Sequence, residues 1–175
     1  RAQYAAMRAW LQGVAAVDVA DRWLSSDPDI EWTESLALRA LRAIRATLAQ
    51  LALRHEQEAL ASLLATGPRS TTALNQVLAG LRRLEELGTP APATKHDVRL
   101  WFAAPLARRL QAAGVATLGE LMTLANDLGR AWWRRVPRIG PAAAATIVRT
   151  LAAAEATLGR LGAHVTGVSL PAALP

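Results

Sequence analysis

Residues 136–141 read Val-Pro-Arg-Ile-Gly-Pro, a combination of residue types that could bind a phosphate group. Gly140 has no Cβ, so it can adopt a left-handed conformation and let the backbone approach an anion closely. Pro141 suits the first turn of a following helix. The amides of Ala142 and Ala143 would then lack partners within the helix, at the positive end of its dipole. The pattern therefore predicts an anion-binding helix N-terminus.

Arginines accompany this motif on both sides and could neutralise neighbouring phosphates. Contacts of this kind hold the sugar-phosphate backbone and do not read bases, so we expect double-stranded DNA as the partner. The predicted DNA-contacting residues are Arg134, Arg135, Arg138, Ile139, Gly140, Ala142, Ala143 and Arg149.

The excess positive charge of the chain lies in the segment that holds this motif. The net charge is +6, and residues 98–150 contain eight Lys and Arg against two Asp and Glu, whereas residues 1–97 contain eleven of each and residues 151–175 one of each. Nineteen of the twenty cations are Arg, which can fork onto phosphate or a base edge. A GC-rich genome would give the same bias, so the location of the charge carries more weight than its identity.

A second strip of cations, Arg39, Arg42 and Arg45, repeats every three residues along an expected helix. Such spacing could follow a phosphate backbone. It is equally typical of a solvated helix face, and both interpretations stay open. Whether residues 1–87 contact DNA or protein is likewise open.

Two other groups of residues could do chemistry, and each has a structural alternative. Asp27, Asp29 and Glu31 could hold a hard cation, but the glycine and distal glutamate of an EF-hand loop are missing, so we expect a turn and no metal or cofactor. Trp132 and Trp133 could stack on bases or on a protein. Because adjacent helical residues point in different directions, at least one of them is expected in the core.

The composition predicts an all-α fold, because Ala dominates the 52% of hydrophobic residues and only 5% of residues are aromatic. We expect an amino-terminal helical bundle over residues 1–88, a linker over 89–97, a second helical subdomain over 98–160 and a tail over 161–175. Helices of the bundle are predicted at Tyr4–Leu11, Ala15–Leu24, from the cap Thr33 to Arg54, at Glu56–Ala65 and from the cap Ser70 or Thr71 to Gly88.

In the second subdomain, Pro105 suits the first turn of a helix that ends at Gly114. Thr117 and Glu120 have the spacing of a capping box at the start of another helix, which Gly129 ends. These elements would bring the 136–141 motif into a compact helical unit.

Residues 136–141, followed by Ala144 and Ile147, resemble the second hairpin and helix of the helix-hairpin-helix family, and residues 105–121 resemble a degenerate first copy. The family usually has Gly where Arg138 stands. The resemblance implies that residues 98–160 form a helix-hairpin-helix (SAM-like) subdomain that grips DNA by its backbone. The small carboxy-terminal domain of the RNA polymerase alpha subunit is similar and contacts both DNA and activators, so a protein partner stays open, as does a plain helical turn in an Ala-rich chain.

Residues 4–165 resemble the amino-terminal extension of bacterial phage-integrase-type tyrosine recombinases. In that family the extension precedes a core-binding and a catalytic domain, so the chain, which begins with Arg1 instead of Met, would be a piece of a longer protein whose tail leads to a missing domain. The matching segments are Tyr4 to Gly13, Ala20 to Leu24, Ala40 to Arg54, Gly114 to Leu121, Trp132-Trp133 and Pro137 to Gly140.

A tyrosine recombinase needs an Arg, a His-x-x-Arg element and a downstream Tyr as nucleophile. His96 and Arg99 match the bare spacing, but they follow a proline-rich stretch, and Tyr4, the single tyrosine, lies upstream. We therefore expect no catalytic residue and no enzyme activity in this fragment.

The chain has no Cys, which fits a reducing compartment, and no secretion signal opens it. Its longest uncharged stretch, residues 161–175, is too short to span a bilayer. We expect a protein of the bacterial cytoplasm, associated with the nucleoid and not with a membrane.

Two functions of different class follow from these expectations. The first is a DNA-binding accessory domain that positions a site-specific recombinase during DNA recombination and integration. The second is a protein interaction domain that oligomerises recombinase subunits, with the hairpin kept as scaffold. A helix-hairpin-helix module of DNA repair or replication is a third possibility.

Overall fold

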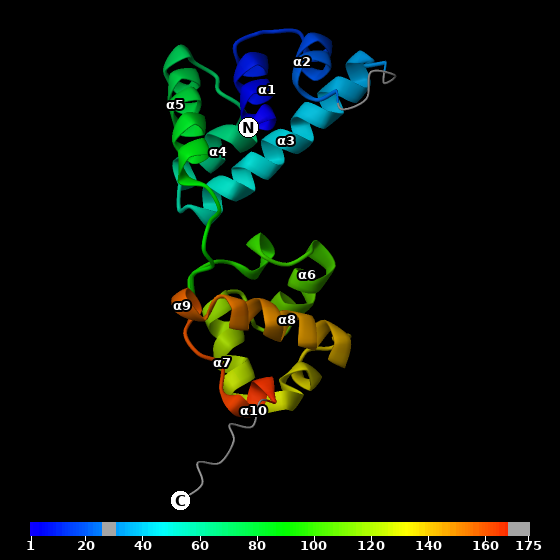
Figure 1. The fold of residues 1–175 in the computed structure, drawn as a ribbon, viewed down its shortest axis with the longest axis vertical. Coiled ribbons are helices and arrows are strands. Elements are labelled where there is room, and N and C mark those ends of the chain that lie inside the picture. Colours follow the sequence, from blue (N-terminus) through cyan, green and yellow to red (C-terminus); the bar gives the residue numbers. More distant parts are fainter. Residues whose placement is uncertain (26–30, 168–175) are drawn as a thin grey trace, which may run out of the picture. The chain divides into compact units, whose positions relative to one another are not determined.

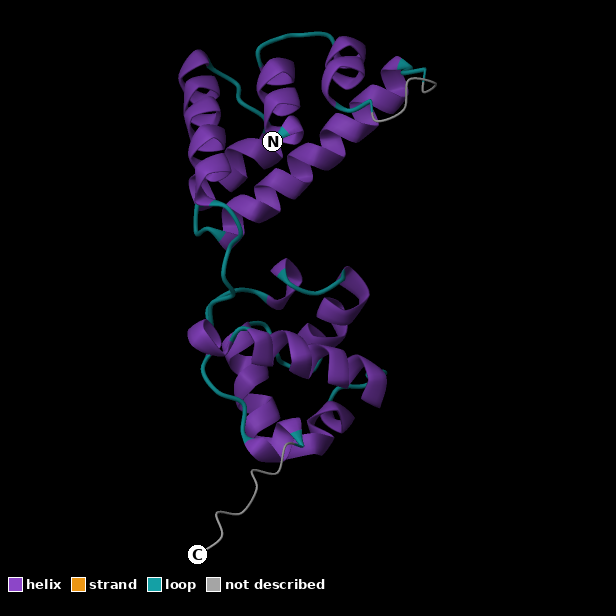
Figure 2. Ribbon diagram, viewed as in Figure 1, coloured by secondary structure: helices purple, strands orange, loops and turns teal. Residues whose placement is uncertain are grey.

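The computed structural model describes residues 1–25 and 31–167, and within these ranges every regular element is a helix, as Figure 2 shows. The predicted all-α class is confirmed. The chain divides into two compact units, Arg1–Pro90 and Ala91–Pro175, each described here by itself. Asp27, Asp29 and the segment Ser169–Pro175, on which sequence expectations were placed, lie outside the described residues.

The described residues of the first unit form five helices, and the predicted caps of the two longest are confirmed. The amide of Leu36 donates to Thr33 Oγ1 at 3.4 Å and the amide of Ala73 donates to Ser70 Oγ at 3.1 Å. The helices are α1 (Ala2–Leu11), α2 (Ala16–Trp23), α3 (Glu34–Arg54), α4 (Glu58–Thr66) and α5 (Thr71–Leu87).

Helix α3 is the element on which α1, α2 and α4 pack (Figure 1). It buries Leu41, Ile44 and Leu48, spaced as the 3.6-residue period predicts. Helix α5 packs on α1 and α4 and buries its own stripe, which includes Leu81 and Leu84. The first unit is therefore a helical bundle with its core along α3.

The second unit is built around one hydrophobic core, to which each of its described helices contributes a buried side chain. Trp132 is 1% exposed, so one of the two adjacent tryptophans is indeed a core residue, while Trp133 is half-buried. The elements are η1 (Val98–Leu100), α6 (Ala104–Ala112), α7 (Leu118–Leu128), η2 (Gly129–Arg135), α8 (Pro141–Ala153), α9 (Glu155–Leu158) and α10 (Ala163–Thr166).

The end of the expected linker, residues 89–97, belongs to this second unit. The carbonyl of Thr94 accepts a hydrogen bond from the amide of Gly119 at 2.8 Å, and the carbonyl of His96 accepts one from Leu118 at 2.9 Å. The His96 side chain is only 5% exposed. Hydrogen bonds to backbone carbonyls leave no pattern in the sequence. Residues 94–97 were therefore predicted to be part of the linker.

The capping box predicted at the start of α7 is confirmed. Thr117 Oγ1 accepts from the amide of Glu120 at 3.2 Å, and Glu120 Oε2 accepts from the amides of Ala116 at 2.6 Å and Thr117 at 3.0 Å. The bonds from these two amides lower the pKa of Glu120 below its ordinary value of 4.5. Helix α7 thus begins with its first-turn amides satisfied.

Glu120→Gln should reduce the acid sensitivity of the fold. Because the pKa of Glu120 is lower in the folded chain, its charge contributes stability that is complete above pH 4.5 and is lost as the pH falls through the folded pKa. The thermal midpoint of Glu120→Gln should lie below that of the wild type at neutral pH, and the two should converge in acid. The matched control is Glu155→Gln, because Glu155 is exposed and makes only a 3.7 Å ion pair with Arg160. An equal difference at pH 7 and pH 3 would contradict the assignment.

Candidate nucleic-acid interface

The turn of residues 136–140 connects η2 to α8 and is anchored by two buried side chains. Val136 is 1% exposed and Ile139 is 4% exposed, and both pack in the core of the second unit. Pro137 and Arg138, between them, are exposed. The side chain of Ile139 therefore holds the turn in place, and it does not reach the surface where a DNA contact was expected.

The left-handed residue of this turn is Arg138 and not Gly140. Gly140 has φ −96° and ψ 173°, an extended conformation open to any residue, so the expectation that it uses its left-handed freedom is wrong. Arg138 has φ +64°, a conformation that costs a residue with a Cβ about 1 kcal/mol. A hydrogen bond of 3.0 Å from Arg109 Nη1 to the Arg138 carbonyl holds the reversed chain against α6. Arg138 stands where the family that this motif resembles usually has Gly.

The N-terminus of α8 carries no side-chain cap, in contrast to that of α7. Gly140 is the N-cap and Pro141 follows it, while the first backbone bond runs from the amide of Ala144 to the Gly140 carbonyl at 3.0 Å. The amides of Ala142 and Ala143 have no acceptor among the described residues. A Cβ built on Gly140 would meet nothing within 4 Å, so the space in front of these donors is open.

A cleft of about 420 Å³ lies between α6 and the turn, and we name it the arginine cleft. Its lining carries three guanidinium groups and no carboxylate. Arg108 and Arg109 were absent from the contacts predicted from sequence, although they lie in the basic segment and share one helix face with two other lining residues. The cleft is lined by Pro105, Arg108, Arg109, Ala112, Pro137 and Arg138.

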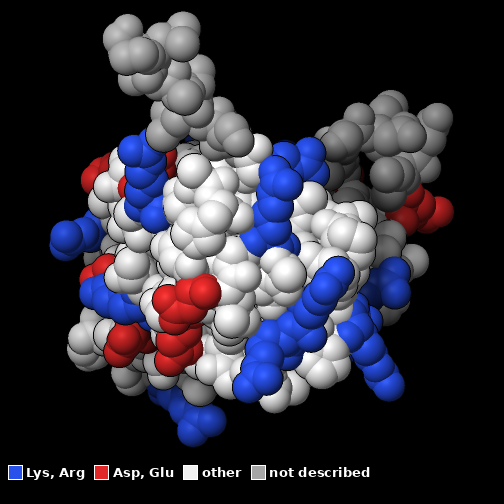
Figure 3. Space-filling view, turned by 90° about the horizontal axis from the view of Figure 1, so that it is seen from below, with Lys and Arg blue, Asp and Glu red and all other residues white. Residues whose placement is uncertain are grey.

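None of the residues that line the arginine cleft is acidic, and the nearby carboxylate of Asp97 is paired with Arg99. Residues 128–154 contain five Arg and neither Asp nor Glu. Two other arginines of the basic segment are engaged, since Arg99 makes a 2.8 Å ion pair with Asp97 and Arg130 donates to the Gly167 carbonyl at 3.1 Å. In Figure 3 basic side chains are spread over the face in view, and they lie among the acidic side chains at its left and largely without them in its middle and lower right. The field at the turn is therefore positive.

The remaining predicted arginines of the second unit flank the turn. Arg134 lies over the ring of Trp133, 5.6 Å from its centroid, and Arg135 is exposed. Arg149 is exposed and donates to Thr146 Oγ1 at 3.1 Å. It lies seven residues after Ala142, about 10 Å along the axis of α8 at the helical rise of about 1.5 Å per residue.

The predicted second strip lies on α3 in the first unit. Arg39 and Arg42 are exposed, but Arg45 is half-buried with its guanidinium 5.7 Å from the centre of the Trp10 ring. Arg45 thus packs on an aromatic face, and only two of the three side chains project freely into solvent.

The three histidines all have partners in the structure. The imidazole nitrogens of His55 and His164 lie 3.2 Å and 2.7 Å from the carbonyls of Gly88 and Asn126, and His96 Nδ1 accepts from the amide of Ala93 at 3.0 Å. Among the described residues no group of three or more His, Asp or Glu side chains could hold a metal ion. In the same residues, no helix combines the length and the apolar character needed to cross a membrane.

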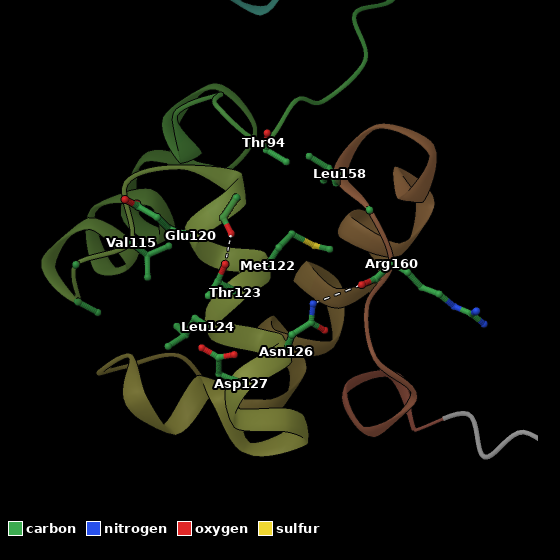
Figure 4. A pocket seen from close by; sticks show the side chains of 14 residues that line it. Thr94, Val115, Glu120, Met122, Thr123, Leu124, Asn126, Asp127, Leu158 and Arg160 are labelled. Atoms are coloured by element: carbon green, nitrogen blue, oxygen red, sulfur yellow. Dashed lines mark hydrogen bonds between the residues drawn. The ribbon is translucent and has the colours of Figure 1, made fainter.

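A second concavity, the α7 groove, has different chemistry from the arginine cleft. It is an opening of about 700 Å³ whose lining includes Met122 and Leu158, and Asn126 of α7 donates a hydrogen bond of 3.4 Å to the Arg160 carbonyl there (Figure 4). Glu120 and Asp127 are among its lining residues, and the Arg160 side chain extends away from it. Two carboxylates at the groove disfavour phosphate, so the arginine cleft and the N-terminus of α8 are the better candidate for a nucleic-acid surface.

A family model described as phage integrase protein matches residues 83–171, which is half of the chain and includes almost all of the second unit. No curated protein and no solved structure matches the chain. The match covers the turn, the arginine cleft and all of α8.

Arg138→Gly should stabilise the fold. Glycine adopts positive φ without the Cβ penalty, and after allowance for its greater freedom in the unfolded chain we expect a gain of about 0.5–1 kcal/mol in the free energy of unfolding. The matched control is Arg135→Gly, which removes the same exposed side chain from η2 and should destabilise. Denaturant unfolding of both variants measures the difference. Equal destabilisation by the two substitutions would contradict the strain at Arg138.

Proposed function

The chain belongs to the phage integrase protein family, and we propose that its second unit binds double-stranded DNA by the sugar-phosphate backbone. The chain would act as a DNA-binding accessory part of a site-specific tyrosine recombinase, without catalytic residues of its own. The observation that carries the proposal is the uncapped N-terminus of α8 beside a cleft that is lined by three arginines and by no acidic residue.

Phosphate suits this surface for three physical reasons. The amides of Ala142 and Ala143 are donors without an acceptor among the described residues, and the helix dipole adds partial positive charge at the same place. The surrounding arginines supply long-range attraction and can release counterions from DNA. None of these groups distinguishes one base from another, so binding of this kind positions a protein on DNA and leaves the choice of sequence to other contacts.

The packing of the turn supports its interpretation as a helix-hairpin-helix. Ile139, Ile147 and Leu151, which were expected to form the core of such a hairpin, are all less than 5% exposed. Ala144, expected to be small where two helices approach, is 3% exposed. The positive φ of Arg138 falls where that family usually has Gly, so the backbone keeps the family's turn although the residue differs.

The α7 groove favours a second function, the docking of a protein partner such as another recombinase subunit. Leu128, next to its lining residue Asp127, is 48% exposed, and the groove combines apolar side chains with carboxylates. The two functions differ in their salt dependence. A protein contact at this groove would survive substitutions at the N-terminus of α8.

Ala142→Glu should abolish most DNA binding while the fold is kept. A carboxylate in the first turn of α8 interacts favourably with the helix dipole but repels a phosphate at the same amides. The matched control is Ala156→Glu, which makes the same change of net charge at an exposed position of α9. Binding to unrelated duplexes should be followed by fluorescence anisotropy over a series of KCl concentrations, with thermal unfolding of each variant.

The wild type and Ala156→Glu should bind all duplexes similarly, with affinity that falls steeply with salt at a slope of about −0.9 per neutralised phosphate. Ala142→Glu should bind at least tenfold more weakly and unfold at the same or a higher temperature. Gly140→Val should also weaken binding, because its side chain would fill the open space before the amides. Undiminished affinity in Ala142→Glu and Gly140→Val would refute the proposal.

A further inference from the structure

We propose that the arginine cleft seats one backbone phosphate of the bound duplex, separate from the phosphate at the N-terminus of α8. This inference rests on the proposed function and extends it to residues of α6. The second unit would then hold a DNA strand on both sides of Arg138, by side chains in the cleft and by backbone amides at the helix.

The residues that α6 contributes to the cleft are placed by helical periodicity. Positions 105, 108, 109 and 112 follow the i, i+3, i+4, i+7 pattern, so they share one face of the helix. Arg108 and Arg109 lie between Pro105 and the small side chain of Ala112. The opposite wall is the exposed part of the turn, which supplies Arg138.

Charge is the physical reason to expect an anion here. Three guanidinium groups line one cleft and none of the other lining residues is ionisable, so their mutual repulsion is relieved when an anion enters. Arg108 has no hydrogen bond or ion pair with any described residue. Each guanidinium offers five N–H donors in a planar fork that matches phosphate oxygens.

Arg109 has two roles in this site. Its Nη1 donates to the Arg138 carbonyl at 3.0 Å, which leaves the other donors of the same guanidinium available to the cleft. The same side chain therefore fixes the wall of the cleft and lines it. Arg109 is for this reason a poor position for a test, since its loss would also disturb the turn.

The identity of the anion follows from the continuity of the surface. Arg138 lines the cleft, and Ala142, whose amide has no acceptor among the described residues, follows it by four positions. A strand bound at the N-terminus of α8 would therefore pass beside the cleft. Successive phosphates of a nucleic-acid strand are the ligand that occupies two such neighbouring positions together, whereas a free phosphate ion occupies one.

Arg108→Gln provides the test, with Arg160→Gln as the matched control. Both residues are exposed in the second unit and both substitutions remove one charge, but Arg160 lies away from the cleft and pairs with Glu155 at 3.7 Å. DNA affinity should be measured by anisotropy from low to high KCl for the wild type, both variants and Ala142→Glu. Thermal unfolding with and without inorganic phosphate completes the set.

Arg108→Gln should weaken binding to all duplexes about five- to tenfold at about 0.1 M salt and reduce the salt slope by about one, the signature of one lost phosphate contact. Arg160→Gln should keep the wild-type slope. If Arg108→Gln also keeps it while Ala142→Glu weakens binding, the cleft inference is overturned and the DNA-binding function stands. If the wild type binds no duplex, both fail. A third outcome is that inorganic phosphate stabilises the wild type but not Arg108→Gln, while the salt slope of DNA binding is the same for both. This result would assign the cleft to a free anion and overturn the inference.

Discussion

Val136 and Ile139 both enter the core of the second unit, and the backbone reverses at the two residues between them. The proline ring fixes φ of Pro137 at a negative value. The positive φ therefore falls on Arg138, despite its Cβ. This reversal places the Arg138 side chain in the arginine cleft and directs the chain into α8 with no side chain over its first amides. The surface proposed to bind phosphate thus depends on the burial of two apolar residues.

Helices α7 and α8 of the second unit differ in how their N-termini are capped. Thr117 and Glu120 satisfy the first amides of α7 and bring a negative charge to its positive end. Gly140 and Pro141 leave α8 with open amides and no carboxylate nearby. Since a cap is worth about 1 kcal/mol to a helix, the open start of α8 has a cost in stability that a bound anion would offset.

Local features of this chain could be predicted from its sequence, and features made by packing could not. The caps Thr33, Ser70 and Thr117 act over three residues, so their spacing alone identified three helix starts. Gly140 was expected to be left-handed because glycine permits that conformation, but the packing of its neighbours decides where the chain reverses. The arginine cleft escaped prediction because it needs α6 to lie against a turn about thirty residues later, and no periodicity encodes that contact.

The use of arginine differs between the two units, and this difference supports a DNA contact in the second. The first unit has ten Arg against ten Asp and Glu. Several of its arginines serve the fold: Arg8 pairs with Glu85 at 2.8 Å, and Arg45 lies over Trp10. The second unit has ten Lys and Arg against four Asp and Glu, and its cations around the turn have no carboxylate to neutralise them. Such uncompensated charge weakens a fold through repulsion, so its concentration at one turn is best explained by an anionic partner.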